Sequence, residues 1–371
     1  MIKRYFDYAG LGIARKDIIR LEKKYKMAMA NSPLKEDEYL RIIDSQKELI
    51  KNKLFSADKY QISYTRNTTE SITIIINSIE LKENDEIIIS SLEHRSVVNS
   101  WELACLKNKS KLRVAEINFD YTEEQIIESF SKEINDNTKV IFCPHIDRNY
   151  GIIFPVKELA SLAKEKDICI IIDGAQAAGL IAINLDEINC DVYVGSFHKW
   201  FNFPAALGFM LVNKNLISKL SRLYVGGKRF ADEKLIDKDF AGDELGTRNV
   251  ALEMCLSKAK RCVEGNKYHI NKINNLISKL KEFKNELKIL NYINIQGRGF
   301  ITIEVLNCKN NMKKIFLEKL FFEKYNIIIG RVIKNNNYYI RISYDIHTTK
   351  RDIKYLLKSL RKYVSNIGNV E

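Results

Sequence analysis

The sequence predicts an α/β fold, with a mainly parallel, mixed sheet in a large domain and a small α+β domain after it. Short apolar, β-rich segments alternate with helical patterns between about residues 60 and 215. Several of these segments, such as Ile168–Asp173, are apolar throughout, as expected for strands that are covered on both faces. After Gly246–Asn249 the pattern changes to a lysine-rich helix followed by strands around a further helix. We expect a large domain over 15–250, a small domain over 251–371, and residues 1–14 packed at the active site or on the small domain.

The individual elements follow from the same patterns. The strands predicted for the large domain are Glu86–Ser90, Leu112–Ile117, Lys139–Cys143, Ile168–Asp173, Val192–Gly195 and Leu207–Val212. The helices predicted between them are Thr69–Ile79, Arg95–Lys107, Thr122–Ile134 and Val156–Lys166; the acidic residues and Gln125 after Thr122 indicate a capped start. In the C-terminal part we expect a long helix over 250–288, strand Phe300–Leu306, helix Met312–Tyr325, strands in "IIIG" and "YYIRISY", and helix Thr348–Tyr363.

Composition narrows the class of protein. The longest apolar runs, such as Ile168–Ile172, are far shorter than the roughly 20 residues of a membrane helix, and the start "MIKRYFDYAG" has no apolar signal segment. The seven cysteines are dispersed, which disfavours a disulfide framework or a zinc site. We therefore expect a cytoplasmic protein that needs no metal and contacts no membrane. The net charge of +13 could indicate nucleic-acid binding, but it is scattered and favours lysines that solvate helix faces.

The strongest chemical signal is a carboxylate and an amine that follow two strands. Asp173 ends an apolar strand, and Lys199 follows the next predicted strand in "VYVGSFHKW". Because the carboxyl ends of parallel strands meet at one edge of an open sheet, these two side chains could bracket one ligand. Taken alone, Asp173 could instead cap the following helix.

Three segments in this order carry a resemblance to a known family: "DGAQAAG" (173–179), "GSFHKW" (195–200) and "GTRN" (246–249). They resemble the class V aminotransferases, which are pyridoxal-phosphate enzymes of fold type I and include cysteine desulfurases, selenocysteine lyases and isopenicillin N epimerases. The resemblance runs from "YFDYAG" near the start to "IRIS" near the end, which is nearly the whole chain.

The resemblance implies a role for each residue of the cofactor site. Lys199 resembles the lysine that forms the Schiff base and then moves the Cα proton, Asp173 the partner of the pyridine nitrogen, and Gln176 the partner of the phenolic oxygen. His94, in "SLEHRSVVNSW", resembles the histidine that stacks on the ring, although a lone surface histidine is the simpler interpretation. The phosphate ligands would be Thr68, Thr69, Ser196, His198 and, from the neighbouring subunit of a homodimer, Thr247.

Substrate binding rests on fewer residues. Arg341 in "IRIS" resembles the arginine that binds the substrate carboxylate, and Ala9 in "YFDYAG" is placed beside the substrate. Arg148 in "HIDRNYG" replaces the family's usual asparagine; it could hold a second, acidic group of the substrate or could point into solvent. The interval before Arg341 holds no cysteine, and Cys308 lies in a different predicted element, so sulfur transfer is disfavoured.

These residues predict an enzyme that acts at Cα of an amino acid. Transamination and C–S or β-elimination are favoured, and the alternatives are sulfur transfer as in cysteine desulfurases, or epimerisation. A binding module that keeps the fold without catalysis would have lost Lys199 or Asp173, and the chain keeps both.

Overall fold

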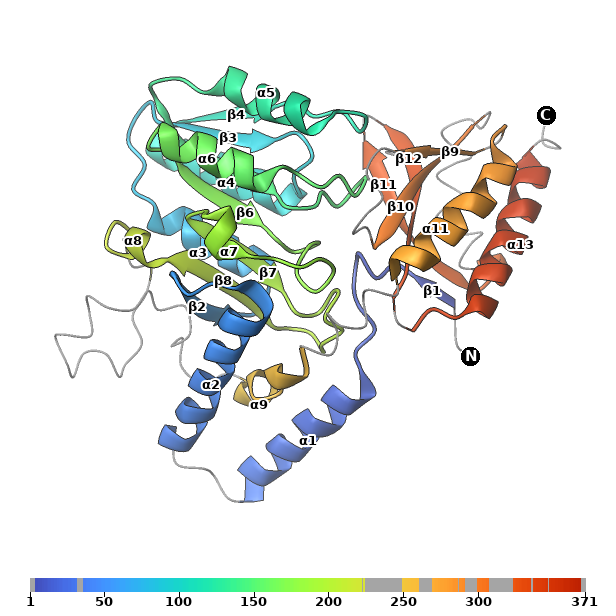
Figure 1. Ribbon diagram of the computed structural model, residues 1–371, viewed down its shortest axis with the longest axis horizontal. Coiled ribbons are helices and arrows are strands. Elements are labelled where there is room, and N and C mark those ends of the chain that lie inside the picture. The colour runs from blue at the N-terminus through green and yellow to red at the C-terminus, as the bar shows by residue number, and fades with distance from the viewer. Residues whose placement is uncertain are drawn as a thin grey trace.

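The computed structural model describes residues 4–31, 36–221, 223, 249–259, 269–285, 287–290, 299–306, 323–334, 336–345 and 347–367. The chain forms a large lobe around one sheet and a smaller lobe around a second sheet, drawn side by side in Figure 1. Three helices, α1 (Lys16–Asn31), α2 (Glu36–Ile50) and the short α9 (Val250–Glu253), extend below the large lobe.

The sheet of the large lobe has seven strands in the order β2-β8-β7-β6-β5-β3-β4. Neighbours from β4 to β7 are parallel, while β8 pairs antiparallel with both β7 and β2, which confirms the expected mainly parallel, mixed sheet. The strands are β2 (Tyr60–Thr65), β3 (Glu86–Ser90), β4 (Lys111–Ala115), β5 (Thr138–Pro144), β6 (Cys169–Asp173), β7 (Val192–Ser196) and β8 (Gly208–Asn213).

Helices cover both faces of this sheet. Alternate residues of the apolar strands enter two separate cores: in β6, Ile170 and Ile172 belong to one and Ile171 to the other. Helices α3 (Thr68–Ser78) and α4 (Arg95–Asn108) contribute to the core of Ile171, while α5 (Glu123–Glu133) and α6 (Val156–Glu165) contribute to the opposite one. All six strands and four helices predicted here are present, and Thr122 and Gln125 form the expected capping box at the start of α5. The short helices α7 (Leu185–Ile188) and α8 (Lys214–Ile217) complete the lobe.

The small lobe holds a five-stranded sheet in the order β1-β11-β12-β10-β9. Its strands are β1 (Arg4–Phe6), β9 (Leu287–Leu290), β10 (Phe300–Val305), β11 (Ile327–Lys334) and β12 (Asn337–Ser343), and helices α11 (His269–Leu280) and α13 (Lys350–Ile367) pack against it. Strand β1 pairs in parallel with β11, so the N-terminal residues complete a sheet whose other strands come from the C-terminal part.

The prediction of one helix over 250–288 is wrong in the part of that range that the structure describes. The chain forms α9, a 3₁₀ turn at Leu256–Lys258, α11, another 3₁₀ turn at Lys281–Phe283, and then β9. Leu287 and Leu290 are buried and pair with β10, so packing in the small lobe overrides the local helical preference. The strands in "FITIEVL", "IIIG" and "YYIRISY" and the final helix are confirmed as β10, β11, β12 and α13. Helix Met312–Tyr325 lies almost entirely outside the described residues.

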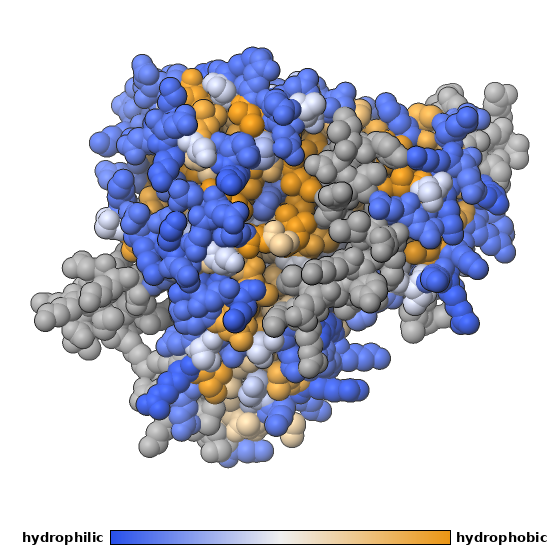
Figure 2. Space-filling model, viewed as in Figure 1, coloured by the Kyte–Doolittle hydropathy of each residue, from blue (hydrophilic) through white to orange (hydrophobic). Residues whose placement is uncertain are grey.

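Surface polarity agrees with the composition. Figure 2 shows hydrophilic residues over most of the large lobe on one face, with apolar residues gathered toward the middle of the molecule. Among the helices described, none combines the length and the apolar character needed to cross a membrane.

Candidate active site

A cavity of about 410 Å³ lies at the carboxyl ends of the parallel strands of the large sheet. Its walls come from the ends of β5, β6 and β7, the start of α3, the start of α4 and the N-terminal segment after β1. Most residues predicted for the site line this cavity: Ala9, Thr68, Thr69, His94, Arg148, Asp173, Gln176, Ser196, His198 and Lys199. Arg341 lines an adjoining cavity, and Thr247 lies outside the described residues.

Lys199 lies in a turn directly after β7. The ring of Phe197 packs against Phe201 and Phe203, and the backbone N–H of Asn202 donates to the Lys199 carbonyl at 3.1 Å. Burial lowers the pKa of the Lys199 amine to about 8; Asp173 opposes this shift, while the positive charges of Arg148 and Arg341 add to it. A lysine with this pKa is partly neutral near physiological pH, which is the form that can act as a nucleophile or a base.

Asp173 ends β6 next to the strand that leads to Lys199. Its Oδ1 accepts a 2.8 Å hydrogen bond from the Ala175 N–H, and among the residues described here nothing bonds to Oδ2. Burial raises the pKa of Asp173, and the charge of Lys199 and the Ala175 N–H partly offset this. The carboxylate would therefore be stabilised by a further cation or N–H donor in the cavity.

One end of the cavity is rich in hydroxyl groups. Asn67 caps α3, and at its first turn the Thr68 Oγ1 lies 2.5 Å from the Ser196 Oγ, which also accepts from the Thr68 N–H at 2.9 Å. The Nδ1 of His198 is buried and lacks a hydrogen-bond partner in the described part of the chain. Burial, followed by the charge of Lys199, lowers the pKa of His198 to about 4. Helix N-terminus, hydroxyls and imidazole form a donor set that suits an anion.

The Glu93–His94 pair forms another wall. The His94 Nδ1 accepts from the Ser96 N–H at 3.1 Å, which assigns the ring proton to Nε2. Partial burial and the charges of Arg148 and Lys199 lower the pKa of His94 to about 4, so the ring is neutral at pH 7. Burial, with the neighbouring Asp173 and Asp147, raises the pKa of Glu93 well above its usual value. Glu93 was not among the residues predicted for the site.

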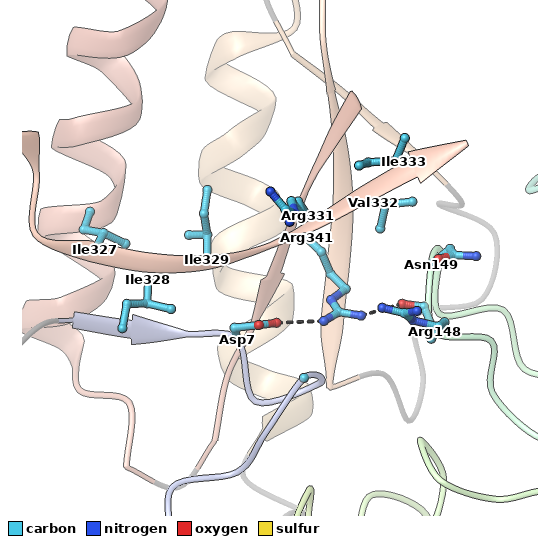
Figure 3. Close-up of a pocket in the computed structure, with 11 residues that line it drawn as sticks. Asp7, Arg148, Asn149, Ile327, Ile328, Ile329, Arg331, Val332, Ile333 and Arg341 are labelled. Atoms are coloured by element: carbon cyan, nitrogen blue, oxygen red, sulfur yellow. Dashed lines mark hydrogen bonds and ion pairs between the residues drawn. The ribbon is translucent and has the colours of Figure 1, made fainter. Parts of the chain in front are cut away.

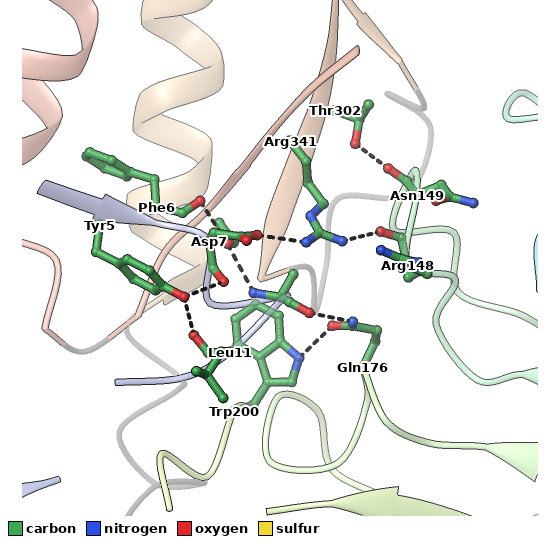
Figure 4. A network of polar contacts seen from close by, with 12 residues as sticks. Tyr5, Phe6, Asp7, Leu11, Arg148, Asn149, Gln176, Trp200, Thr302 and Arg341 are labelled. Carbon is green, nitrogen blue, oxygen red and sulfur yellow. Dashed lines mark hydrogen bonds and ion pairs between the residues drawn. The ribbon is translucent and has the colours of Figure 1, made fainter. Parts of the chain in front are cut away.

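The side chain of Gln176 is held in place on two sides. Its Nε2 donates to the Ala9 carbonyl at 2.8 Å, and its Oε1 accepts from the Trp200 Nε1 at 3.0 Å, as Figure 4 shows. An amide nitrogen carries two hydrogens, so Nε2 retains one donor for a ligand in the cavity. Trp200 in turn stacks on Phe300 of the small lobe, with ring centroids 6.3 Å apart.

Arg341 is held by the N-terminal segment. Its Nη2 lies 2.7 Å from Oδ1 of Asp7, and its Nη1 donates to the Arg148 carbonyl at 2.8 Å (Figures 3 and 4). These residues line a second cavity of about 880 Å³, beside β11. Asp7 was not predicted as a site residue, although it lies within the "YFDYAG" motif.

Comparison with known proteins identifies the family. The sequence profile described as "Aminotransferase class-V" matches residues 4–356. The chain belongs to the class V aminotransferase family. It is similar to a probable cysteine desulfurase from Borreliella burgdorferi (28% identity over 358 residues, 88% of this chain and 82% of that protein). The matched stretch covers only 36% of one other curated cysteine desulfurase and 48% of another.

Solved structures of class V enzymes share the fold. A cysteine desulfurase from Thermococcus onnurineus superposes with a TM-score of 0.83 at 17% identity, over 98% of this chain and 95% of that one. The enzyme C-DES, solved as a mutant with glycine covalently linked to its pyridoxal-phosphate cofactor, gives a TM-score of 0.83 at 17% identity and covers 96% of both chains. These similarities confirm the expected fold type.

Enzymes of the class V family depend on pyridoxal phosphate, and the cavity fits that group. Thr68, Ser196 and the unpartnered His198 Nδ1 would hold the phosphate at the start of α3. Asp173 would pair with the ring nitrogen, Gln176 would donate to a ring oxygen, and His94 would face the ring. Thr69, whose Oγ1 lies 3.4 Å from the Ser96 Oγ, is at the cavity mouth.

Within the described part of the chain, no cysteine lines the cavity that contains Lys199. The five cysteines described are unpaired, and four of them are buried. Cys143 directly precedes Pro144, which lines the cavity. Burial raises the pKa of the Cys143 thiol well above its usual value, which disfavours the reactive thiolate. Cys308 lies outside the described residues.

Proposed function

We propose that this chain is a pyridoxal-phosphate enzyme that removes the proton from Cα of an amino acid, with Lys199 as the base, and catalyses transamination or β-elimination. The observation that carries the proposal is the buried Lys199 amine with a pKa of about 8, in one cavity with Asp173 and a donor-rich anion site. The cofactor, when bound, supplies a ring that withdraws electrons from Cα.

The protein's own residues have separate roles in substrate binding and proton transfer. Arg341 offers a planar guanidinium to the substrate carboxylate. Ala9, whose carbonyl fixes Gln176, forms part of the wall of the Lys199 cavity. Lys199 holds or accepts the Cα proton, because its lowered pKa leaves part of the amine neutral. Asp173 supplies a carboxylate to the cavity wall, and Trp200 fixes Gln176 from the side opposite Ala9.

The absence of a thiol from the described cavity lining favours these reactions over sulfur transfer to the enzyme, which needs a cysteine nucleophile near the substrate sulfur. A panel of amino acids distinguishes the products. Transamination would yield a 2-oxo acid and an aminated cofactor, while β-elimination would yield pyruvate, ammonium and the group released from Cβ.

An absorption spectrum of the purified protein tests the proposal. We expect a visible band from bound cofactor that is lost or shifted in Lys199→Ala and retained in Lys214→Ala, a lysine outside the cavity. A protein without such a band after incubation with pyridoxal phosphate, or a band unchanged in Lys199→Ala, would contradict it. Cofactor bound without turnover of any amino acid would support an idle binding module instead.

A second candidate function is cysteine desulfuration, because the curated relatives named above are cysteine desulfurases. Its test is specific. If the enzyme releases alanine and persulfide sulfur from cysteine, and Cys308→Ser abolishes this while the cofactor band persists, the desulfurase function is supported. Racemised amino acid without other products would indicate epimerisation.

We also propose a homodimer that works in the cytoplasm. The cavity is open where Ala205 and Ala206 are exposed, and a second subunit that contributes Thr247 would close it. Unpaired cysteines in the described chain suit a reducing compartment. Light scattering that gives the mass of a monomer at micromolar concentration would contradict the dimer.

A further inference from the structure

Arg148 lies in a loop that is built to hold one conformation. The loop follows β5, and the buried Asp147 carboxylate accepts backbone N–H groups from Asn149 at 2.7 Å, Tyr150 at 3.0 Å and Ile152 at 2.8 Å. The small lobe fixes the same loop, since Arg341 donates to the Arg148 carbonyl and the Thr302 hydroxyl donates to the Asn149 carbonyl. The backbone at Arg148 is therefore positioned before any ligand binds.

The guanidinium of Arg148 has no counter-ion in the described part of the chain. Asp147 is occupied by backbone N–H groups and Asp7 by Arg341, and Arg148 itself makes no side-chain hydrogen bond or ion pair there. The Arg148 side chain is half-buried, and it lines both the cavity that contains Lys199 and the cavity beside β11. Burial and the charge of Arg341 lower the pKa of Arg148, and the charges of Asp147 and Asp7 oppose this only in part. Such a group gains from a bound anion.

Arg148 and Gly10 are the two described residues that line both cavities. A ligand anchored near Lys199 that extends past Gly10 must therefore pass Arg148. Figure 3 shows the side chains of Arg148 and Arg341 drawn close together, with Asp7 on the far side of Arg341. Asp7 neutralises Arg341 only, so the two guanidinium groups together leave a positive surplus beside the site.

We infer that Arg148 binds a second carboxylate, on the substrate's side chain, while Arg341 binds the α-carboxylate, so that the substrate is an acidic amino acid. This inference rests on the proposed function for the α-amino end of the substrate, and the binding site itself requires only the two arginines. A planar guanidinium can hold a carboxylate through two parallel hydrogen bonds, which an asparagine at this position cannot do.

Calorimetric titration of the holoenzyme with unreactive acids tests the inference. Succinate and glutarate should bind about tenfold or more tightly than butyrate, since a charge-assisted, bidentate contact is gained. In Arg148→Asn this ratio should fall to about threefold or less, with little change for butyrate, and Arg148→Lys should be intermediate because it keeps the charge without the fork. The control Arg361→Gln, an exposed arginine of α13, should keep the wild-type ratio.

Two results would overturn the inference: equal affinity of the wild-type protein for mono- and dicarboxylates, or an equal loss of both in Arg148→Asn. The second result would assign Arg148 to the α-carboxylate instead. The same titration of Lys199→Ala separates this inference from the proposed function. A dicarboxylate preference that depends on Arg148 would support this inference even if the protein never showed a cofactor band. A cofactor band would support the proposed function even if the preference were absent.

Discussion

Asp7 and Arg341 form an ion pair of 2.7 Å between segments that lie at opposite ends of the chain. The arginine side chain is 3% exposed and the aspartate side chain 25% exposed, so the contact is largely removed from water. The pair joins the N-terminal segment to strand β12, and it also sets the direction of the guanidinium that we assign to the substrate carboxylate.

Asp7→Asn should destabilise the protein. The amide can still accept a hydrogen bond, but the buried Arg341 charge loses its counter-ion, so we expect the free energy of unfolding to fall by about 1–3 kcal/mol. Urea unfolding measures this change. Asp44→Asn is the matched control, because Asp44 is 69% exposed and lies 3.9 Å from Lys47, and it should change stability by less than about 0.5 kcal/mol. Equal stability of the two variants would show that the Asp7 pair contributes nothing.

Gly330→Ala should displace one side chain of the Asp7–Arg341 ion pair. A Cβ at Gly330 would lie 2.5 Å from Oδ1 of Asp7 and 2.7 Å from Nε of Arg341, so one of these side chains must move. We expect the affinity for a carboxylate ligand such as butyrate to fall by about tenfold, because the guanidinium loses its alignment. Gly330→Ser, which adds one more atom, should bind at least as weakly; unchanged affinity in both variants would be inconsistent with the crowding.

The amine of Lys199 should titrate near pH 8. In cofactor-free protein, the rate of reaction with pyridoxal phosphate should rise with pH with a midpoint near pH 8 and level above about pH 9–10, since only the neutral amine reacts. Asp173→Asn removes a negative charge that raises this pKa, so the midpoint should move to lower pH. Arg148→Asn removes a positive charge that lowers it, so the midpoint should move to higher pH. Stopped-flow absorbance across the range from about pH 6 to about pH 11 measures the midpoints, and shifts of the opposite sign would refute the assignment.

His145 should make the fold sensitive to acid. Its ring is buried, with Nδ1 2.9 Å from the Tyr193 hydroxyl, and burial lowers its pKa to about 4, against 6.5 in the unfolded chain. As pH falls from 6.5 to 4, the unfolded state takes up a proton first, and stability falls by about 3 kcal/mol. Asp173 and Glu93 have raised pKa values and act in the opposite sense, so comparison with a variant isolates His145.

Urea unfolding of His145→Gln at about pH 7.5 and about pH 4.5 provides that comparison. The variant should lose less stability between the two pH values than the wild type, because a glutamine side chain does not titrate. His347→Gln, at an exposed position, should follow the wild type. A wild-type slope in His145→Gln would mean that the ring takes up its proton as readily in the folded protein as in the unfolded chain.

Local patterns predicted the large lobe well. Strand β3 has the residues expected for it, and α5 begins at its predicted cap, because buried strands and capped helices are encoded in a few neighbouring residues. The small lobe was harder. Strand β1 has three residues and is defined by pairing with β11 far along the chain, and β9 follows a lysine-rich stretch that resembles a helix.

The site shows the same division. Lys199, Asp173 and Gln176 lie within continuous motifs, and the sequence indicates them directly. The contact of Asp7 with Arg341 joins residues whose neighbours give no sign of each other, and Gly330 matters only because both side chains pack against it. Glu93 was not predicted because a glutamate beside a histidine is ordinary on a protein surface. Only the folded chain buries Glu93 and brings it close to Asp173 at the end of β6.

The N-terminal segment has a mechanical consequence. Strand β1 is a strand of the small sheet, while Gly12 donates from its N–H to the His198 carbonyl at 2.8 Å and Arg15 to the Asn202 carbonyl at 2.9 Å. Gly12 passes so close to the Lys199 backbone that a Cβ there would lie 2.0 Å from the Lys199 carbonyl oxygen. The few residues between Phe6 and Gly12 thus work as a short tether, anchored at one end in each lobe. Any rotation of the small lobe must stretch or slacken this tether at the lysine, so lobe movement and the position of the reactive amine are coupled.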